Sequence, residues 1–271
     1  MRSKTAVRLP RMALYVLCAL FATAAEAQDI TQARLVGIGS ANLLDTYLSQ
    51  EKYSGYDIRY LSHTLREDST RWKRVMIHQG EFASASNRSE NGTMIAGMYN
   101  FQFGFQREIG RWNAGNGTLL LDVGCRLDAN AGFVYNTRNS NNPAQARAYL
   151  NITPALAGAY RFMIRNHPYT LHYDLEVPLA GVMFSPNYGQ SYYEIFSRGN
   201  YDHNIVATWP GNAPNLRHLL TMDATLGKLT FRVGYLGDFR QARVNGLKNH
   251  LYTHALMIGV VRKFQLIKKQ P

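Results

Sequence analysis

Ionisable side chains alternate with apolar ones in one short stretch of the chain. His172, Asp174 and Glu176 fall at every second position of the run Tyr169 to Val177, so they share one face of a β-strand. Paired carboxylates can serve a hydrolase as general acid and base, and His-x-Asp can begin a metal site. The sequence shows no unlike environments for the two carboxylates and no third ligand at a diagnostic spacing. It therefore assigns no catalytic residue, metal or cofactor.

Other charged residues follow the same alternation in other runs of the chain. The resulting polar cluster comprises Asp122, Arg126, Asp128, His172, Asp174, Glu176, Arg217, Asp223 and Arg232. Acids and bases are similar in number, and buried charges need partners. The cluster predicts an ion-paired filling of a narrow interior. The alternative is a polar site or narrow channel in which His172, Asp174 and Glu176 converge.

One long segment, Ser185 to Thr208, breaks the alternation and is rich in aromatic and polar residues. It includes a possible helical turn at Ser191 to Phe196. Its candidate ligand-binding side chains are Tyr188, Tyr192, Tyr193, Glu194, Tyr201, Asp202 and His203. This composition is typical of a sugar- or lipid-binding surface, and equally of a loop whose aromatic residues close one end of the fold.

A serine hydrolase would need a serine activated by a histidine. The known barrel enzymes that cut lipids carry His-x-Ser arrangements, and this chain offers none. Ser62 and His63 are adjacent, so their side chains point to opposite faces of a strand. A membrane-embedded lipid hydrolase is therefore the alternative rather than the leading interpretation.

The elements that carry these residues have a period of two. Clear alternating runs cover Ile95 to Glu108, Leu119 to Asn130, Gln145 to Phe162, Tyr169 to Val177, Leu216 to Leu226 and Leu229 to Arg243. Most of them reach the roughly ten residues that a tilted membrane strand needs. The pattern predicts an all-β fold, an antiparallel transmembrane β-barrel of about ten strands. Weak patterns at Arg71 to Ala85 and Tyr201 to Trp209 leave eight or twelve strands as alternatives, and a soluble periplasmic β-protein as a third class.

The last run, His250 to Phe264, places Leu256, Ile258, Val260 and Phe264 on one face. It ends on an aromatic residue with a glycine five positions earlier. This spacing resembles the C-terminal signal by which outer-membrane barrels are recognised during assembly, and it implies the barrel-assembly machinery as a partner. Arg262 departs from that pattern, and residues 265–271 form a basic tail.

Residues 1–27 have the features of a secretory signal peptide. Four basic residues precede the apolar run Met12 to Ala24, and Ala25-Glu26-Ala27 is a small-x-small cleavage site. Cleavage after Ala27 lowers the net charge from +12 to +9 and leaves Cys125 as the only cysteine, so no intrachain disulfide forms. Its neighbours on the strand are apolar, which indicates a small apolar residue rather than a reactive thiol.

The domain plan that follows is a signal peptide at 1–27, an N-terminal periplasmic arm or plug at 28–54, a barrel at 55–264 and the tail. Residues 28–54 show the weakest strand pattern. They contain Gly37-x-Gly39, which lacks the flanking strand, helix and third glycine of a nucleotide-binding loop.

Two longer motifs, LLDTYLSQEKYSGYDIRYLSH and FSPNYGQSYYEIFSRGNYDHN, resemble an uncharacterised Bacteroidota-type family of outer-membrane barrels. The resemblance covers nearly the whole mature chain. It implies location and fold, and no activity.

These observations predict a bacterial outer-membrane barrel that acts in ligand binding, passage or envelope structure. The expected partners are outer-membrane lipids and lipopolysaccharide, whose phosphates the positive charge would suit. Nucleic acid is not expected for an exported chain, and the small-molecule ligand is left open.

Overall fold

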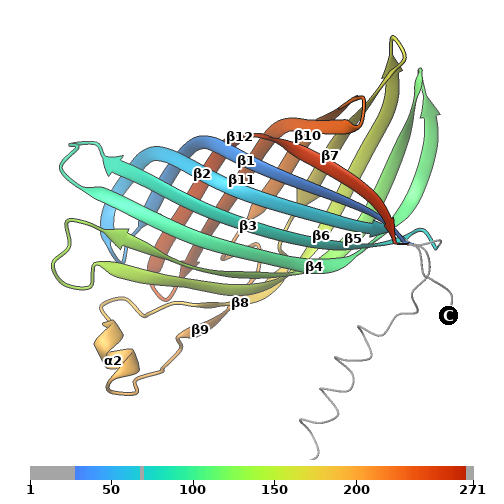
Figure 1. Cartoon of the computed structure of the whole chain (residues 1–271). Helices are drawn as coiled ribbons and strands as arrows, with labels where there is room; N and C mark the ends of the chain where they lie inside the picture. The colour runs from blue at the N-terminus through green and yellow to red at the C-terminus, as the bar shows by residue number, and fades with distance from the viewer. Residues whose placement is uncertain (1–27, 68–69, 267–271) are drawn as a thin grey trace, which may run out of the picture.

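The chain folds into a closed antiparallel β-barrel with ten strand positions (Figure 1). The computed structural model describes residues 28–67 and 70–266, so the predicted signal peptide lies outside the described residues. The elements are β1 Gln28–Asp45, β2 Ser49–Glu67, β3 Trp72–Asn87, β4 Thr93–Ala114, β5 Gly117–Asn136, β6 Ala144–Ile164, β7 His167–Glu176, β8 Ala180–Phe184, α2 Tyr192–Phe196, β9 Ile205–Thr208, β10 Leu216–Leu226, β11 Leu229–Val244 and β12 Leu247–Leu266. The predicted all-β fold and strand number are confirmed.

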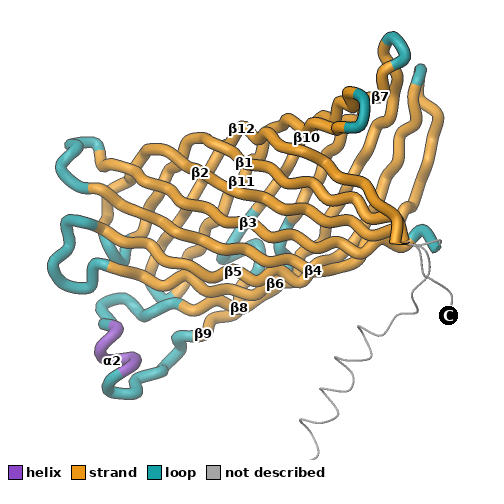
Figure 2. The backbone as a smooth tube through the Cα atoms, in the orientation of Figure 1, coloured by secondary structure: helices purple, strands orange, loops and turns teal. Residues whose placement is uncertain are grey.

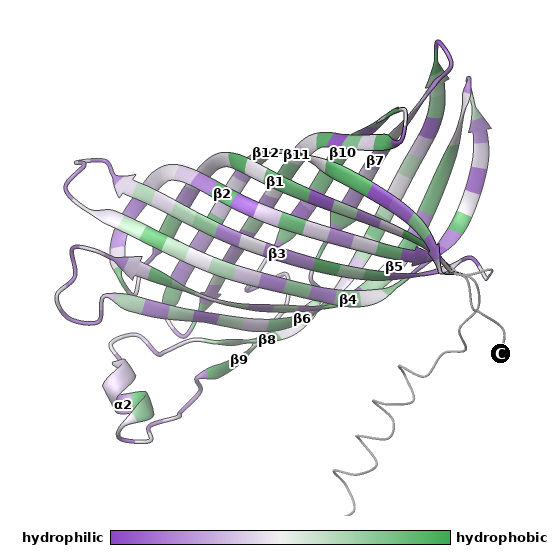
Figure 3. Ribbon diagram, viewed as in Figure 1, coloured by the Kyte–Doolittle hydropathy of each residue, from purple (hydrophilic) through white to green (hydrophobic). Residues whose placement is uncertain are grey.

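Apolar and polar residues alternate along the strands, as Figure 3 shows. On β12, Leu256 and Ile258 are 72% and 58% exposed on the outside, whereas Met257 between them is 2% exposed in the interior. Most of the exposed large side chains are apolar, and many buried ones are charged. This inverted distribution is the one expected for a barrel whose outer surface contacts lipid.

The barrel closes where β1 pairs with β12. The ladder is antiparallel and unbroken from Gln28 opposite Leu266 to Asp45 opposite Asn249. A Cβ on Gly259 would lie 1.9 Å from the carbonyl oxygen of Arg34, so only glycine permits the close approach of the two strands there. The glycine of the C-terminal pattern therefore serves closure of the barrel.

The prediction of an arm or plug at residues 28–54 is wrong, because β1 is a full barrel strand. The interior face of β1 carries Ala33, Leu35, Ala41 and Leu43, while apolar residues also lie outside, so hydropathy does not alternate. The barrel therefore covers 28–266, and β12 includes the first two residues of the predicted tail. Residues 267–271 lie outside the described residues.

Two barrel positions are each shared by two short strands. β7 and β8 both pair with β6, and Pro178, which has no N–H to donate, lies between them. β9 and β10 are separated by the longer segment 209–215. β9 pairs with β8 alone and is the last strand of the sheet. No ladder therefore joins β9 to residues 240–244 of β11.

The two ends of the barrel differ. At the end where Gln28 and Leu266 meet, two-residue turns join β4 to β5, β6 to β7 and β10 to β11. The opposite end, which we call the loop end, carries most of the longer connections, including the 185–204 segment with α2 (Figure 2). Among the described residues, no helix is long and apolar enough to cross a membrane.

Candidate functional site

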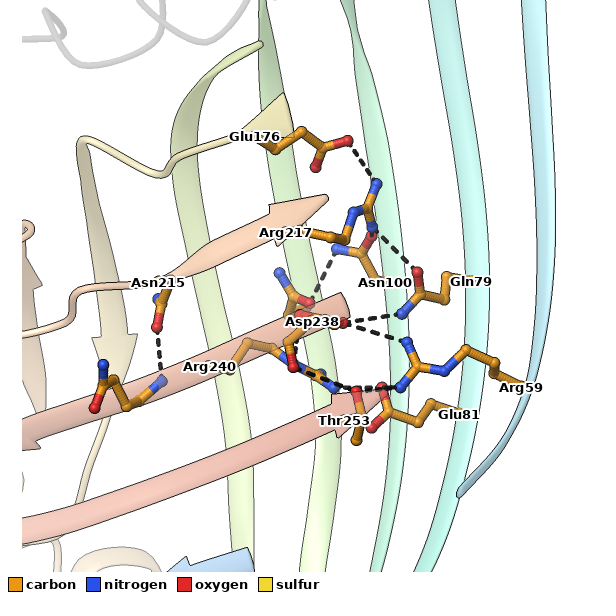
Figure 4. Close-up of polar contacts among 12 residues, drawn as sticks. Arg59, Gln79, Glu81, Asn100, Glu176, Asn215, Arg217, Asp238, Arg240 and Thr253 are labelled. Atoms are coloured by element: carbon orange, nitrogen blue, oxygen red, sulfur yellow. Dashed lines mark hydrogen bonds and ion pairs between the residues drawn. The ribbon is translucent and has the colours of Figure 1, made fainter. Parts of the chain in front are cut away.

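The middle of the lumen holds a connected set of ionic and amide side chains, which we call the central network (Figure 4). Its members are Asp57, Arg59, Gln79, Glu81, Asn100, Arg126, Asp174, Glu176, Arg217, Asp238 and Arg240. All of them point inward because each occupies an interior position of a two-residue repeat.

One half of the central network gathers around Arg59. Its guanidinium lies 2.6 Å from Asp57, 3.5 Å from Glu81 and 3.6 Å from Asp238. Arg240 contacts two of these three carboxylates, Glu81 and Asp238. Each of the three carboxylates thus has a guanidinium partner, as buried charges require, although two guanidinium groups are shared among three carboxylates.

The other half gathers around Glu176. One of its oxygens accepts hydrogen bonds from Arg126 and from Arg217, the latter at 2.7 Å. The second oxygen accepts from Gln102 at 2.8 Å. Arg126 also forms a bidentate pair with Asp174 at 3.0 and 2.9 Å. Both carboxylates of the predicted acidic pair therefore have cationic partners.

Gln79 joins the two halves across the lumen. Its amide nitrogen donates to Asp238 at 3.2 Å, and its amide oxygen accepts from Arg217 at 3.2 Å. Gln79 lies on β3 and Arg217 on β10, which are five positions apart in either direction around the barrel. Side chains from opposite walls thus meet, and the lumen is filled at this level.

The nine residues of the predicted polar cluster fall into three groups. Arg126, Asp174, Glu176 and Arg217 belong to the central network, and Asp128 joins it through Asn100. Asp122 pairs with Lys73 at 2.7 Å, and Gln106 links this pair to Arg126 by hydrogen bonds of 3.2 and 3.4 Å. His172, Asp223 and Arg232 form a third group, in which Asp223 lies 3.2 Å from His172 and 2.5 Å from Arg232.

The alternative in which His172, Asp174 and Glu176 converge is not what the structure shows. The His172 ring turns to Asp223 on β10, whereas Asp174 and Glu176 turn to Arg126 on β5. Residues two positions apart on a tilted strand contact side chains of different strands. Side chains that share one face of a strand therefore need not belong to one site.

Sequence reasoning missed Gln79, Glu81 and Arg240. β3 has Val75 and Ile77 on its interior face beside Gln79 and Glu81, so its hydropathy does not alternate. Arg240 could have been found, because it follows Asp238 by two positions on a strand that was predicted.

A cleft lies in the lumen between the central network and the loop end. It encloses about 580 Å³ of space, part of which is open to solvent. Its apolar wall is formed by Leu43, Met94, Met98, Val134, Met183 and Leu251. Its polar lining includes Arg147, Tyr149, Thr208, Asn215, Arg240, Gln241 and Asn249.

Two uncharged polar groups of the cleft lack a hydrogen-bond partner among the described residues, and the charged Arg240 Nε lies 3.3 Å from Asp238 without forming a hydrogen bond. The two uncharged groups are the hydroxyl of Thr208 and the amide nitrogen of Asn249, and each residue is 7% exposed. The nearby cations are already paired, Arg147 with Asp45 at 2.7 Å and Arg240 with Glu81 and Asp238. An unpaired buried polar group is costly, so the cleft favours a ligand with a neutral polar group.

Further spaces lie along the rest of the lumen. A space of about 350 Å³ adjoins the cleft, and one of about 280 Å³ lies beside His63 and Leu219. Both are lined by Glu176 and Arg217, so these two side chains separate them. A wide vestibule of about 1750 Å³ opens at the end that holds the termini of β1 and β12, lined by His172, Asp223 and Arg232.

The candidate ligand loop lies beyond the loop end, next to β8 and β9 (Figure 1). The predicted helical turn is confirmed as α2, with a capping box in which Ser191 and Glu194 bond each other's backbone N–H. Hydrogen bonds from the backbone N–H and hydroxyl of Ser191 lower the pKa of Glu194. Tyr188, Tyr193, Tyr201, Asp202 and His203 are exposed, and Asp202 pairs with His203 at 2.5 Å.

Tyr192 joins this loop to the barrel through its side chain, and the Tyr188 backbone N–H donates to the Asn245 carbonyl in the β11–β12 turn at 3.1 Å. The Tyr192 ring packs edge-on against Tyr47 at 5.9 Å, and its hydroxyl accepts a hydrogen bond from the Ala146 backbone N–H at 2.6 Å. Partial burial, with Tyr192, Asp45 and Glu194 nearby, raises the pKa of Tyr47 to about 12. The loop therefore divides between a packed aromatic contact and an exposed surface.

Four histidines have hydrogen-bond partners other than serine, whereas the buried Nε2 of His63 has no partner among the described residues. His78 contacts Tyr99, His172 contacts Asp223, and His250 contacts Asn42. His254 contacts Tyr235. Over the part of the chain that the structure describes, no group of three or more His, Cys, Asp or Glu residues is placed to hold a metal.

Several solved structures match the chain over most of its length. The translocator domain of autotransporter NalP from Neisseria meningitidis matches with a TM-score of 0.37 and 12% identity, over 94% of this chain and 94% of that chain. The transport unit of the autotransporter AIDA-I from Escherichia coli matches at 0.40 and 10%, over 92% and 96%. The outer membrane protease OmpT from Escherichia coli matches at 0.40 and 8%, over 88% and 96%.

No curated protein matches the chain in sequence. A family model, described as a protein of unknown function (DUF3316), matches residues 11–271. That match takes in the ten-strand barrel, the central network and the cleft. The chain belongs to the DUF3316 family.

Proposed function

We propose that this protein is an outer-membrane barrel with a closed lumen, which binds a small uncharged amphiphile in the cleft at its loop end. The observation that carries the proposal is the cleft itself. It combines an apolar wall with two unpartnered polar atoms, Thr208 Oγ1 and Asn249 Nδ2, directly beside the central network.

The membrane location is supported by the outer surface of the barrel. Exposed apolar residues surround it, including Ile58, Leu127, Ile152 and Phe231. Contact between this apolar surface and water would be unfavourable, whereas the lipid chains of a bilayer would cover it. Contact with outer-membrane lipids and lipopolysaccharide, export by the predicted signal peptide and assembly by the barrel-assembly machinery belong to the same proposal. A Bacteroidota source stays a prediction.

The short turns support an orientation. Outer-membrane barrels have short periplasmic turns and longer extracellular loops. The two-residue turns lie at the end where Gln28 and Leu266 meet, so this end would face the periplasm. The cleft and α2 would then face outward.

A binding role has more support than solute passage. Glu176 and Arg217 separate neighbouring spaces of the lumen, and Gln79 meets Arg217 from the opposite wall. Ion pairs that are buried and hydrogen-bonded on several sides are costly to break. A solute would have to break them to pass.

The neutral character of the ligand follows from the charges around the cleft. Arg147 and Arg240 have carboxylate partners, so a negatively charged group would compete with Asp45, Glu81 and Asp238. A hydroxyl group can instead accept from Asn249 and donate to Thr208. The ligand class is therefore a single apolar chain with a hydroxylated head.

A lipid hydrolase has weaker support. Its serine would need a histidine as base, and the histidines with identified partners contact tyrosine, asparagine or aspartate. Ser62 and His63 follow one another on β2, on opposite faces of the strand.

The test is photolabelling of the reconstituted protein with a monoacylglycerol that carries a diazirine in its chain. The expected result is labelling of Met94, Met98 or Leu251, suppressed by excess unlabelled monoacylglycerol. Met98→Trp fills the cleft and should abolish this labelling. Tyr99→Trp places the same side chain on the outer surface and should leave it unchanged.

Labelling restricted to lipid-facing residues, with no competition by the unlabelled compound, would overturn the proposal. So would equal saturable labelling in the Met98→Trp and Tyr99→Trp variants, since the cleft would then not hold the probe.

A further inference from the structure

The barrel wall contains a seam at the loop end, formed by β9, the segment 209–215 and residues 240–244 of β11. β11 pairs with β10 only as far as Phe239, and β9 pairs only with β8. Between Phe239 and the loop end, no ladder connects β11 to β9. Residues of the 209–215 segment bridge the two strands instead.

The bonds across the seam are few and partly made by side chains. The Gln241 backbone N–H donates to Asn215 Oδ1 at 2.7 Å, and the Gln241 amide donates to the Pro214 carbonyl at 3.0 Å. One backbone bond, from the Arg243 N–H to the Asn212 carbonyl at 2.8 Å, joins β11 to the segment, and the Asn212 amide donates to the Ala207 carbonyl of β9 at 2.9 Å. Just beyond the seam, the Asn245 amide donates to the carbonyls of Ser185 and His203. Wall segments held this way open at lower cost than a continuous ladder.

The inner side of the seam is a wall of the cleft. Thr208, Ala213, Asn215, Gln241 and Ala242 belong to the seam, and all of them line the cleft. Thr208, whose hydroxyl lacks a partner, is the last residue of β9. This break in the ladder thus lies directly against the candidate binding space.

The outer side of the seam is apolar along β9, whereas β11 presents the exposed Arg243 there. Ile205 is 69% exposed and Trp209 is 54% exposed, and Val182 on the adjacent strand β8 is also exposed. Tryptophan is enriched where a membrane protein meets the boundary between lipid and water. The seam therefore separates the cleft from a surface suited to lipid chains.

We infer that the seam between β9 and β11 is a lateral port, through which a single-chain lipid with an uncharged hydroxylated head passes from the outer leaflet into the cleft. The inference rests on the proposed binding function and adds the source and route of the ligand. A lipid that enters sideways keeps its chain out of water throughout, which a route through the loop-end mouth does not allow.

The test closes the seam with a reducible crosslink. Asn215→Cys and Gln241→Cys, in a Cys125→Ala background, place thiols on two residues that are hydrogen-bonded across the seam, from the Gln241 backbone N–H to the Asn215 side chain, and a short disulfide-containing bifunctional reagent joins them. The diazirine monoacylglycerol is delivered from donor vesicles, and flash labelling at intervals gives the rate of cleft occupation. A matched control crosslinks Thr225→Cys to Thr230→Cys, a directly paired position of the β10–β11 ladder.

The crosslink should slow occupation roughly tenfold or more, with final occupancy unchanged, because a blocked route alters rate rather than affinity. Reduction should restore the rate, and the control crosslink should have no effect. Equal rates in the closed and reduced seam would overturn the port while leaving the binding function intact. Absence of saturable labelling in every form, including the uncrosslinked protein, would instead overturn the binding function.

Discussion

Arg217 on β10 donates a hydrogen bond of 3.2 Å to Gln79 on β3, from the opposite wall of the barrel. The same guanidinium reaches Glu176 at 2.7 Å and Asn100 at 3.1 Å. A side chain that is tied to three other strands cannot swing aside without breaking several bonds. The centre of the lumen therefore acts as part of the folded core, although its residues are charged.

Removing a carboxylate from this network should destabilise the barrel. Glu176→Gln leaves Arg126 and Arg217 without their shared anion in a buried position, and the expected loss is roughly 3–5 kcal/mol in the free energy of unfolding. Denaturant unfolding in lipid vesicles measures it. Arg111→Gln is the control, because Arg111 is 59% exposed in its pair with Glu108, and it should cost about 1 kcal/mol or less.

A charge on the outer surface should impair insertion. Leu127→Arg replaces a side chain that is 51% exposed on the apolar surface, and it should cost roughly 2–4 kcal/mol if it lies near the bilayer midplane. Thr170→Arg, in the wall of the vestibule, is the matched control and should fold normally. Heat-modifiable mobility on a gel reports the folded fraction, and equal losses in both variants would contradict a lipid-facing exterior.

The N-terminus of the mature protein should be Gln28. The small-x-small site ends at Ala27, and β1 begins at the next residue, where Gln28 already pairs with Leu266. Mass spectrometry of the protein from outer-membrane fractions measures this. Recovery in the soluble periplasmic fraction would contradict the proposed location, and a terminus inside β1 would contradict the cleavage site.

The sequence predicted strands well where the two faces differ in polarity. β4, β5, β6, β7, β10, β11 and β12 were predicted close to their observed positions, because outer apolar residues alternate with inner polar ones. β1 was missed because the lumen beside it is apolar, with Leu35 packed among Leu61, Val75, Ile77 and Met257. A periodicity of hydropathy cannot reveal a strand that is apolar on both faces.

The polar cluster was only partly predictable for a different reason. The period of two places His172 and Asp174 on one face, and it says nothing about which strand each side chain meets across the lumen. That depends on strand tilt and register, which group His172 with Asp223 and Asp174 with Arg126. The cleft was unpredictable because it depends on the break between β9 and β10.

The last prediction concerns conduction. The intact protein in a planar bilayer should show no steady ion current, because Glu176 and Arg217 close the space between neighbouring cavities of the lumen. The double variant Glu176→Ala/Arg217→Ala removes one charge of each sign, so the net charge of the lumen is kept while the level between the two spaces loses two long side chains. Conductance should then appear, since the spaces on either side would join. Asp223→Ala/Arg232→Ala is the matched control, because it removes an ion pair of the same kind from the wall of the already open vestibule. Steady conductance in the unmodified protein would show that the central network does not close the lumen, and a silent double variant would mean that other side chains hold it shut.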